Sequence, residues 1–187
     1  MSIQEFYKKD ILPKLKKDFG FKNDREVPRL EKVVINVGFG KHIKDNEYIK
    51  NLEESLVKIT GQKPVFTKAR KSISSFKIRE GMVIGAKLTL RKKRMYDFVE
   101  KLLSVTFPRV RDFQGISEKS VDRQGNLTIG FKDNLAFPEI GAQDLDKTHG
   151  MEIILKTTAK SREEGLELFR LLKFPFKEQM KEMQKEK

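Results

Sequence analysis

Four segments of the chain alternate apolar and polar residues, the pattern of strands that bury one face. They are Val33–Gly38, Val83–Arg91, Asn126–Lys132 and Met151–Ala159. In the second segment, for example, Leu88 lies between Lys87 and Thr89. Successive side chains of a strand point to opposite faces, so each segment has one apolar side. A further short strand is predicted at Pro64–Thr67.

Four other segments repeat apolar residues at three- and four-residue steps, the spacing of an amphipathic helix. The first extends from Ile3 to Phe19 and stops at Gly20, and Pro13 inside it predicts a kink or a break. The others are expected at Ile49–Ile59, at Met95–Leu103 with an end before Pro108, and from a capping box of Ser161 and Glu164 through Leu172.

A sheet with one apolar and one polar face is usually antiparallel, with helices on one side only. The sequence therefore predicts an α+β fold: a mostly antiparallel sheet, helices packed on one face, and a polar opposite face. The 187 residues suffice for one core, and no repeat or linker divides them. We expect a single domain over residues 1–176 and a charged tail over residues 177–187.

Positive charge is concentrated in one part of the chain. The formal net charge is +13, and the segment Gly61–Arg94 carries many Lys and Arg residues against one acid, Glu80. Such an excess indicates either a polyanionic partner or a strongly solvated surface. Charge alone leaves nucleic acid, acidic proteins and anionic membranes open as partners.

Composition excludes several kinds of site and argues against a membrane or secreted protein. The chain has no cysteine, which excludes disulfides, cysteine zinc sites, iron–sulfur clusters and cysteine nucleophiles. No run approaches the roughly 18 apolar residues of a membrane span, and the N-terminus does not have the pattern of a signal peptide. We therefore expect no membrane partner and a cytoplasmic location.

Motifs for enzymatic chemistry are weak. Gly38-Phe39-Gly40 follows a strand but lacks the third glycine of a dinucleotide-binding turn, because position 43 is Ile43. The two histidines are far apart in sequence, and no calcium-loop pattern surrounds Asp144. We expect no cofactor, no metal and no catalysis. The alternatives are a nucleotide-using enzyme, a DNA-binding module and an adaptor for acidic proteins.

The polar face of the predicted sheet is rich in basic and hydrogen-bonding side chains and poor in aromatic ones. It would display Asn36, Lys87, Thr89, Arg91, Asn126, Thr128, Lys132 and Lys156. Without aromatic rings to stack on bases, this face suits the backbone and grooves of a folded RNA. An ordinary solvated sheet face is the alternative.

A basic loop, Ala69–Gly81, connects two of the predicted strands. Its tip holds Phe76 and Ile78 among cations, a combination that suits packing on nucleotides and sugars. The alternative is that both apolar side chains fold back into the core.

Several long motifs resemble the bacterial-type 50S ribosomal protein L-five family (universal L-five). They are VPRLEKVVINVGFG, ITGQKPVFTKARKSISSFKIREG, IGAKLTLR, FPRVRDFQGIS, FPEI and TTAKSREEGLELF. The resemblance covers nearly the whole chain, in order, up to Phe176. Glu80 and Met82 stand at positions that vary in the family, and Glu80 would weaken the loop's attraction for phosphate slightly.

The resemblance implies a structural constituent of the large ribosomal subunit, with a role in translation in the cytoplasmic ribosome. Its expected partners are 5S rRNA, which it would help attach in the central protuberance, 23S rRNA, the P-site tRNA, the small-subunit protein S-thirteen at an intersubunit bridge, and neighbouring central-protuberance proteins.

The resemblance also implies residue roles. Asn36, Gln62 and Thr89 match positions that bind 5S rRNA, and we add to that surface the cations Lys63, Lys68, Arg70, Lys71, Lys87 and Arg91. The tip residues Ser75, Phe76, Lys77, Ile78 and Arg79 match the loop that reaches the P-site tRNA. The bridge surface is expected at Arg109, Arg111, Asp112, Phe113, Pro138, Glu139 and Asp144.

Overall fold

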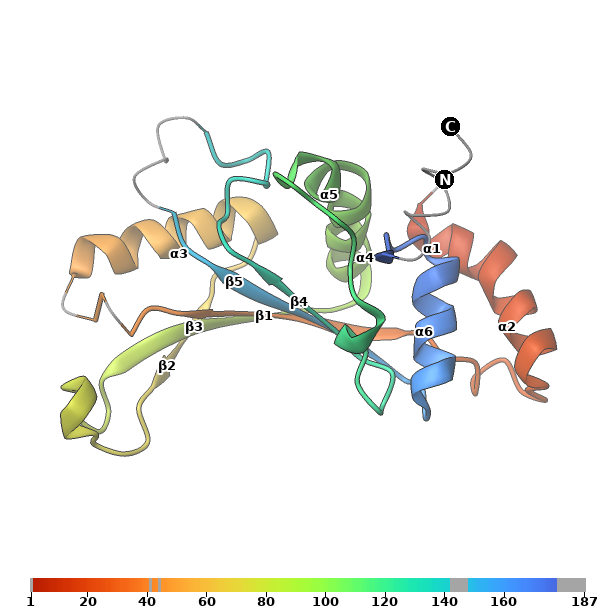
Figure 1. Ribbon diagram of the computed structural model, residues 1–187, viewed down its shortest axis with the longest axis horizontal. Helices are drawn as coiled ribbons and strands as arrows, with labels where there is room; N and C mark the ends of the chain where they lie inside the picture. The colour runs from red at the N-terminus through yellow and green to blue at the C-terminus, as the bar shows by residue number, and fades with distance from the viewer. Residues whose placement is uncertain (1, 41, 44, 142–147, 178–187) are drawn as a thin grey trace. The chain divides into compact units, whose positions relative to one another are not determined.

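The computed structural model describes residues 2–40, 42–43, 45–141 and 148–177. Figure 1 labels their helices and strands. Their contacts group into two compact units. Unit 1 comprises residues 1–33, 90–129 and 154–187, and unit 2 comprises residues 34–89 and 130–153. The single domain expected over residues 1–176 stays a prediction. Of the tail expected at residues 177–187, all but Lys177 lies outside the described residues.

The strands form one five-stranded antiparallel sheet in the order β2-β3-β1-β5-β4. They are β1 (Leu30–Gly38), β2 (Val65–Lys68), β3 (Val83–Leu90), β4 (Leu127–Phe131) and β5 (Met151–Thr157). The predicted α+β class and antiparallel sheet are confirmed, and each predicted strand forms with its ends shifted by at most a few residues. All strands except β2 contribute residues to both units.

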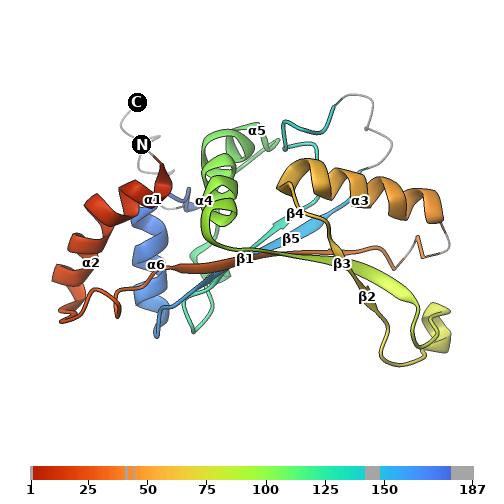
Figure 2. The ribbon, with the colours of Figure 1, turned by 180° about the vertical axis from the view of Figure 1, so that it is seen from behind.

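The predicted alternation is visible in the burial of the strands. In β1, Ile35 and Val37 are each 1% exposed, while Asn36 between them is exposed. Within unit 2, the buried side packs under α3 (Asn46–Thr60), as Figures 1 and 2 show from opposite directions. Leu52, Leu56 and Ile59 are the buried apolar face of that helix.

The first helical segment contains the irregularity predicted at Pro13. It consists of α1 (Ile3–Phe6), a π-helical turn η1 (Tyr7–Ile11) and α2 (Leu12–Phe19). At the end of the wide turn, the Leu12 N–H donates to the Tyr7 carbonyl, five residues back. A proline cannot donate and its ring collides with the carbonyl four residues earlier, so a wider turn before it relieves the conflict.

The helix predicted to end before Pro108 continues through it, so that prediction was wrong. The segment consists of α4 (Lys92–Lys101), a second π-helical turn η3 (Leu102–Thr106) and α5 (Phe107–Arg109). The Phe107 N–H again donates five residues back, to Leu102. The wide turn lets the helix pass the proline, as it does before Pro13.

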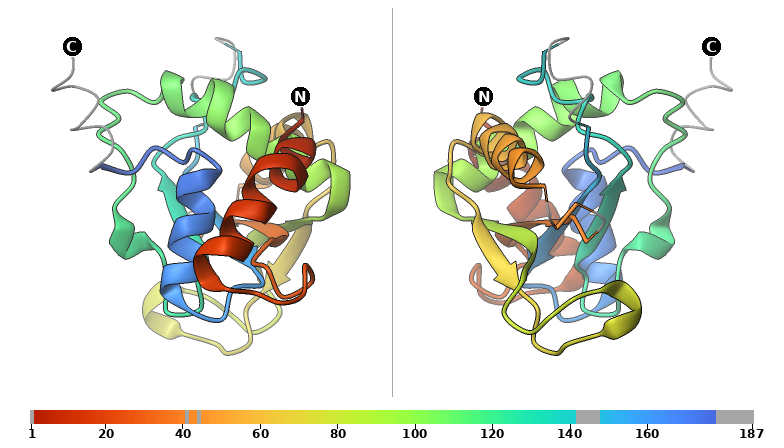
Figure 3. Two further views of the ribbon diagram at one scale, coloured as in Figure 1. Left: turned by 90° about the vertical axis from the view of Figure 1, so that its right-hand side faces the viewer. Right: turned by 90° about the vertical axis from the view of Figure 1, so that its left-hand side faces the viewer.

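The last helix, α6 (Arg162–Leu171), begins as predicted at Ser161, whose hydroxyl accepts from the Glu164 N–H at 3.2 Å. In unit 1 it packs beside α2 (Figure 3). An aromatic cluster lies at its end: the Phe169 and Phe174 rings are 5.2 Å apart, and the Phe174 and Phe107 rings 6.2 Å apart. Two short 3-10 turns, η2 (Ser74–Phe76) and η4 (Glu118–Ser120), complete the described elements.

Candidate nucleic-acid interface

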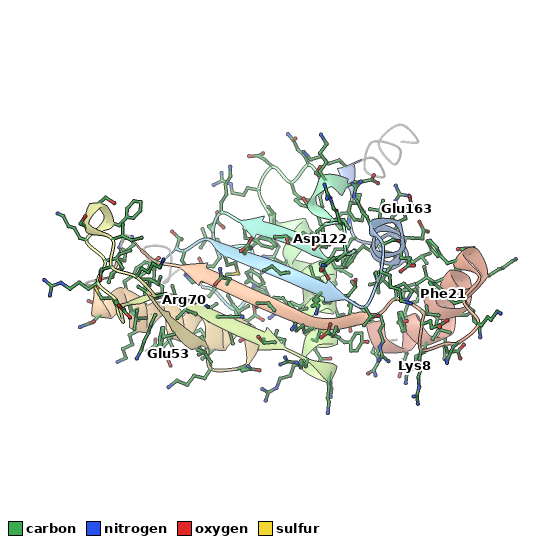
Figure 4. All side chains as sticks on the ribbon, turned by 90° about the horizontal axis from the view of Figure 1, so that it is seen from below. Lys8, Phe21, Glu53, Arg70, Asp122 and Glu163 are labelled. Carbon is green, nitrogen blue, oxygen red and sulfur yellow. The ribbon has the colours of Figure 1, made fainter. Side chains whose placement is uncertain are left out.

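The polar side of β1 and β3 in unit 2 is open. Asn36 and Lys87 are exposed and Thr89 is half-buried, whereas their neighbours Ala86 and Leu88 are at most 2% exposed. Figure 4 views these strands from the side opposite α3, and no α-helix among the described residues of unit 2 crosses them there. Both neutral residues predicted on this face are therefore accessible to a partner.

Atoms of the neighbouring strands β1 and β2 approach Gly85 of β3 closely. A Cβ at that position would lie 2.9 Å from the Thr67 hydroxyl oxygen and 2.9 Å from the Val37 carbonyl oxygen. Thr67 is also the residue paired with Gly85 in the antiparallel β2–β3 ladder. The glycine thus makes room for the Thr67 side chain on the polar face, a role consistent with glycine where groups approach closely.

Gln62 and Thr89 are joined by a hydrogen bond. The Gln62 Nε2 donates to the Thr89 backbone carbonyl at 3.4 Å, across 27 residues of sequence. The turn that carries Gln62 is held by Thr60, whose hydroxyl donates to the Leu56 carbonyl at 2.7 Å and accepts from the Gln62 N–H at 3.3 Å. Two of the three neutral candidates therefore form one connected group at the end of α3.

The cations predicted for the same RNA-binding surface differ in their surroundings. Lys63 forms an ion pair of 3.1 Å with Glu53 of α3, although its side chain is 79% exposed. The other predicted cations are all exposed, and none of them has a described ion pair: they are Lys68, Arg70, Lys71, Lys87 and Arg91. Arg91 follows β3 directly and belongs to unit 1.

The loop between β2 and β3 has an ordered tip. Ile73 and Ile78 pair as in an antiparallel ladder, with N–H to carbonyl distances of 2.9 Å and 3.1 Å. Phe76 is 69% exposed, so the alternative that it folds into the core is wrong, while Ile78 is half-buried. The tip thus presents an aromatic ring to solvent on a closed support.

Local hydrogen bonds fix the backbone of this tip. Lys77 has a left-handed backbone with φ of 55°, and its N–H donates to the Ser74 carbonyl at 3.0 Å. Lower in the loop, the Glu80 N–H donates to the Ser72 hydroxyl at 2.9 Å. Ser75, Lys77 and Arg79 are all exposed, so every residue of the predicted tRNA-contact set except Ile78 lies on the surface.

The residues predicted at the intersubunit bridge belong to different units and are described separately. In unit 1, Arg109, Arg111 and Asp112 are exposed, and half-buried Phe113 stacks on Phe107 with ring centroids 5.2 Å apart. In unit 2, Pro138 is exposed and Glu139 half-buried. Asp144 lies outside the described residues.

One residue predicted on the polar face serves the fold. Asn126 donates to the Asp122 carboxylate from its side chain and from its backbone, each at 2.8 Å, and its Oδ1 accepts from the Thr157 N–H at 3.1 Å. Thr128 and Lys156 are half-buried and Lys132 is exposed. Lys156 pairs with Glu31 at 3.1 Å.

The sequence prediction missed two polar-face residues on β2. Val65, which is 70% exposed, and Thr67 pair with Lys87 and Gly85. Opposite residues of an antiparallel pair point to the same face, so both lie beside Lys87. The alternation of Val65, Phe66 and Thr67 is the signal that could have shown this.

Within the described ranges, no three His, Cys, Asp or Glu side chains are grouped so as to hold a metal ion. None of the helices in that part of the chain combines the length and apolar character that a membrane crossing requires.

Comparison with known proteins gives two adjoining family matches. The model described as "Ribosomal protein L5" matches residues 23–79, and the model for the C-terminus of the same ribosomal protein family matches residues 83–176. Together they include the polar face, the basic loop up to Arg79 and most of unit 1.

Curated relatives match over almost their full length. The large ribosomal subunit protein uL5 of Clostridium botulinum (strain Loch Maree / Type A3) is 52% identical over 174 residues, which cover 93% of this chain and 97% of the relative. The protein of the same name from Clostridium tetani (strain Massachusetts / E88) is 51% identical with the same coverage. The chain therefore belongs to the ribosomal protein L5 family, whose members are structural, non-enzymatic constituents of the large subunit of the cytoplasmic ribosome and act in translation.

Proposed function

We propose that this protein binds 5S rRNA through the polar face of β1, β2 and β3 and helps attach it in the central protuberance. Asn36, Gln62 and Thr89 supply neutral hydrogen-bonding groups, and the exposed cations on these strands and in the basic loop supply attraction for phosphates. The observation that carries the proposal is the hydrogen bond from Gln62 to the Thr89 carbonyl, together with accessible Asn36, because this bond fixes the Gln62 side chain on an open face.

A filter-binding titration tests this assignment. Asn36→Ala and Thr89→Val each remove a hydrogen-bonding group, and a partner group left unpaired at an interface costs about 1–3 kcal/mol. We expect each variant to bind 5S rRNA at least roughly five-fold more weakly, since ~1 kcal/mol corresponds to that factor. Asn46→Ala on α3 is the matched control, and it should bind as the wild type does. Unchanged affinity in both test variants would contradict the assignment.

The β2–β3 loop is proposed to contact the P-site tRNA through Ser75, Phe76, Lys77, Ile78 and Arg79. What supports this is the exposed Phe76 ring on a tip closed by the Ile73–Ile78 pair. An exposed ring can pack on nucleotides, and the adjacent cations can bind phosphates.

A designed loop separates the two RNA contacts. Replacing Ser74–Lys77 by Asn-Gly keeps the Ile73–Ile78 pair, because this dipeptide forms the two-residue hairpin turn. We expect unchanged 5S rRNA affinity but weaker retention of P-site tRNA on reconstituted ribosomes. Loss of 5S binding instead would show that the loop has been assigned the wrong partner.

The remaining proposed partners are 23S rRNA, neighbouring central-protuberance proteins and the small-subunit protein S-thirteen. For the intersubunit bridge, the support is the exposed cluster of Arg109, Arg111 and Asp112 beside the stacked Phe113. The charge reversal Arg111→Glu should weaken association of large subunits with small subunits in a sedimentation assay, and normal 70S formation would argue against this contact.

A further inference from the structure

A cavity of about 420 Å³ opens in unit 1, between the start of β1, the first turn of α4 and the end of β5. The backbone at its rim is fixed by two hydrogen bonds. The Arg29 N–H donates to the Thr158 hydroxyl at 3.1 Å, and the Thr158 N–H donates to the Arg29 carbonyl at 2.9 Å. Arg29 lines the cavity, which we call the Arg29 pocket.

Three cations line this pocket, and no described acid pairs with any of them. They are Arg29, Lys92 and Lys93. The one acid in the lining, Glu31, forms an ion pair of 3.1 Å with Lys156, and this lysine lowers the pKa of Glu31 below its usual value. The charge of Glu31 is therefore already balanced at pH 7, and the pocket keeps an excess of positive charge.

The other walls suit a sugar–phosphate group. Leu30 and Met95, at most 5% exposed, give the pocket an apolar floor. Tyr96 stands beside Arg29, and burial raises the pKa of its hydroxyl, so the hydroxyl stays protonated and can donate a hydrogen bond. The neighbouring Tyr7 is already engaged, since its hydroxyl donates to the Pro28 carbonyl at 3.0 Å.

We propose that the Arg29 pocket binds a backbone phosphate of 5S rRNA, with Arg29, Lys92 and Lys93 contacting the phosphate and the apolar floor contacting the adjoining ribose. The inference rests on the proposed function, and it adds a contact in unit 1 to the face assigned in unit 2. Arginine suits such a site because its planar donors match phosphate oxygens in pairs.

The salt dependence of 5S rRNA binding tests the proposal. Removing one cation from a phosphate lowers the slope of log affinity against log salt by about 1. Arg29→Gln and Lys93→Gln are expected to weaken binding several-fold and to lower that slope. Tyr96→Phe should weaken binding without changing the slope. Lys50→Gln on the outer side of α3 is the matched control and should match the wild type in both quantities.

Lysine acetylation gives a second readout on the unmodified protein. In the complex with 5S rRNA, Lys92 and Lys93 should be protected from an amine-reactive reagent while Lys50 stays reactive, and nuclease digestion should restore their reactivity. If Asn36→Ala weakens binding but Arg29→Gln changes neither affinity nor slope, and Lys92 and Lys93 stay reactive, the pocket does not contact 5S rRNA; this proposal then falls while the proposed function stands. If the wild type does not bind 5S rRNA, both proposals fall.

Discussion

At the scale of single residues, Asp122 organises the turn that leads into β4. Its Oδ1 accepts from the Gln124 and Asn126 N–H groups, and its Oδ2 accepts from the Asn126 side chain, each at 2.8 Å. Burial alone would raise the pKa of Asp122, but the hydrogen bonds from Asn126 and Gln124 outweigh it and lower the pKa. The ionised form is therefore the one that stabilises the turn.

The stabilisation by Asp122 should depend on pH. Because the pKa is lower in the folded chain than in the unfolded one, the contribution is complete above the unfolded value of about 3.9 and is lost as pH falls through the folded value. Asp122→Ala should therefore lower the urea midpoint at pH 7, and the difference from the wild type should shrink below pH ~4.

The matched control for this experiment is Asp97→Ala, which removes an exposed carboxylate with no described hydrogen bond. It should leave the urea midpoint nearly unchanged at neutral pH. The urea midpoints of the wild type and Asp122→Ala could instead differ by the same amount at pH 7 and well below pH ~4. That result would show that the carboxylate charge does not stabilise the turn.

At the scale of elements, α6 packs directly on the backbone of the turn at Gly125. A Cβ at Gly165 would lie 2.3 Å from the Gly125 Cα and 2.5 Å from its carbonyl oxygen. The same carbonyl accepts from the Thr157 hydroxyl at 2.8 Å, which ties the turn to the end of β5. Two glycines thus allow a helix and a turn to touch without side chains between them.

Gly165→Ala should be strongly destabilising for this reason. Alanine is the better helix former, so the substitution would stabilise an isolated helix. In the folded protein, however, the new methyl group would collide with the Gly125 backbone, which cannot easily move away. We expect the free energy of unfolding to fall by roughly 3 kcal/mol in urea denaturation. Gly130→Ala is the control, since a Cβ there meets nothing within 4 Å. Equal stability of the two variants would contradict the close packing.

The helices and strands also show which features the pattern of apolar and polar residues can predict. Alternation located β1, β3, β4 and β5 because burial of one face constrains every second residue. The end expected before Pro108 was wrong because a π-helical turn at Leu102–Thr106 carries the helix past the proline, whereas the prediction assumed that a helix ends before a proline. Polar-face residues of β2 were missed because a four-residue strand alternates too few times to be distinctive.

Two substitutions of Lys77 at the loop tip can distinguish the effect of its backbone conformation from the effect of its charge. Lys77 adopts a left-handed backbone, which glycine tolerates and β-branched residues do not. Lys77→Gly removes the cation and keeps the turn, whereas Lys77→Val also strains it by about 1–2 kcal/mol. We expect Lys77→Val to weaken P-site tRNA retention more than Lys77→Gly does. Equal weakening in both would show that only the charge matters.

At the scale of the whole molecule, strand alternation predicts which single residues lie on the candidate surface, but it does not predict contacts between residues that are distant in sequence. Alternation alone put Asn36 and Thr89 on the polar side, and both are accessible. The link from Gln62 to Thr89 could not be read from the residues, because it joins positions 27 apart through the fold. The Arg29 pocket was likewise invisible, since it combines residues from both ends of the chain with the start of α4.

The net charge of +13 and the neutral polar groups should affect the salt dependence of RNA binding differently. Cations at phosphates release counterions, so wild-type affinity for 5S rRNA should fall linearly with salt on a double logarithmic plot. Lys87→Gln or Arg70→Gln should lower the slope by about 1 for each phosphate that the removed cation had bound. Asn36→Ala should shift the whole line to weaker affinity and keep its slope.

This pair of effects separates the proposed mechanism from its charge-only alternative. A surface that attracts RNA by charge alone would be unaffected by Asn36→Ala, and it would bind any folded RNA of similar length equally well. If the neutral groups read the shape of a particular RNA, 5S rRNA should outcompete an unrelated folded RNA, and Asn36→Ala should reduce that preference at every salt concentration. Because the Gln62 amide donates to the Thr89 backbone carbonyl, Gln62→Ala should also reduce this preference, whereas Thr89→Val leaves that hydrogen bond in place.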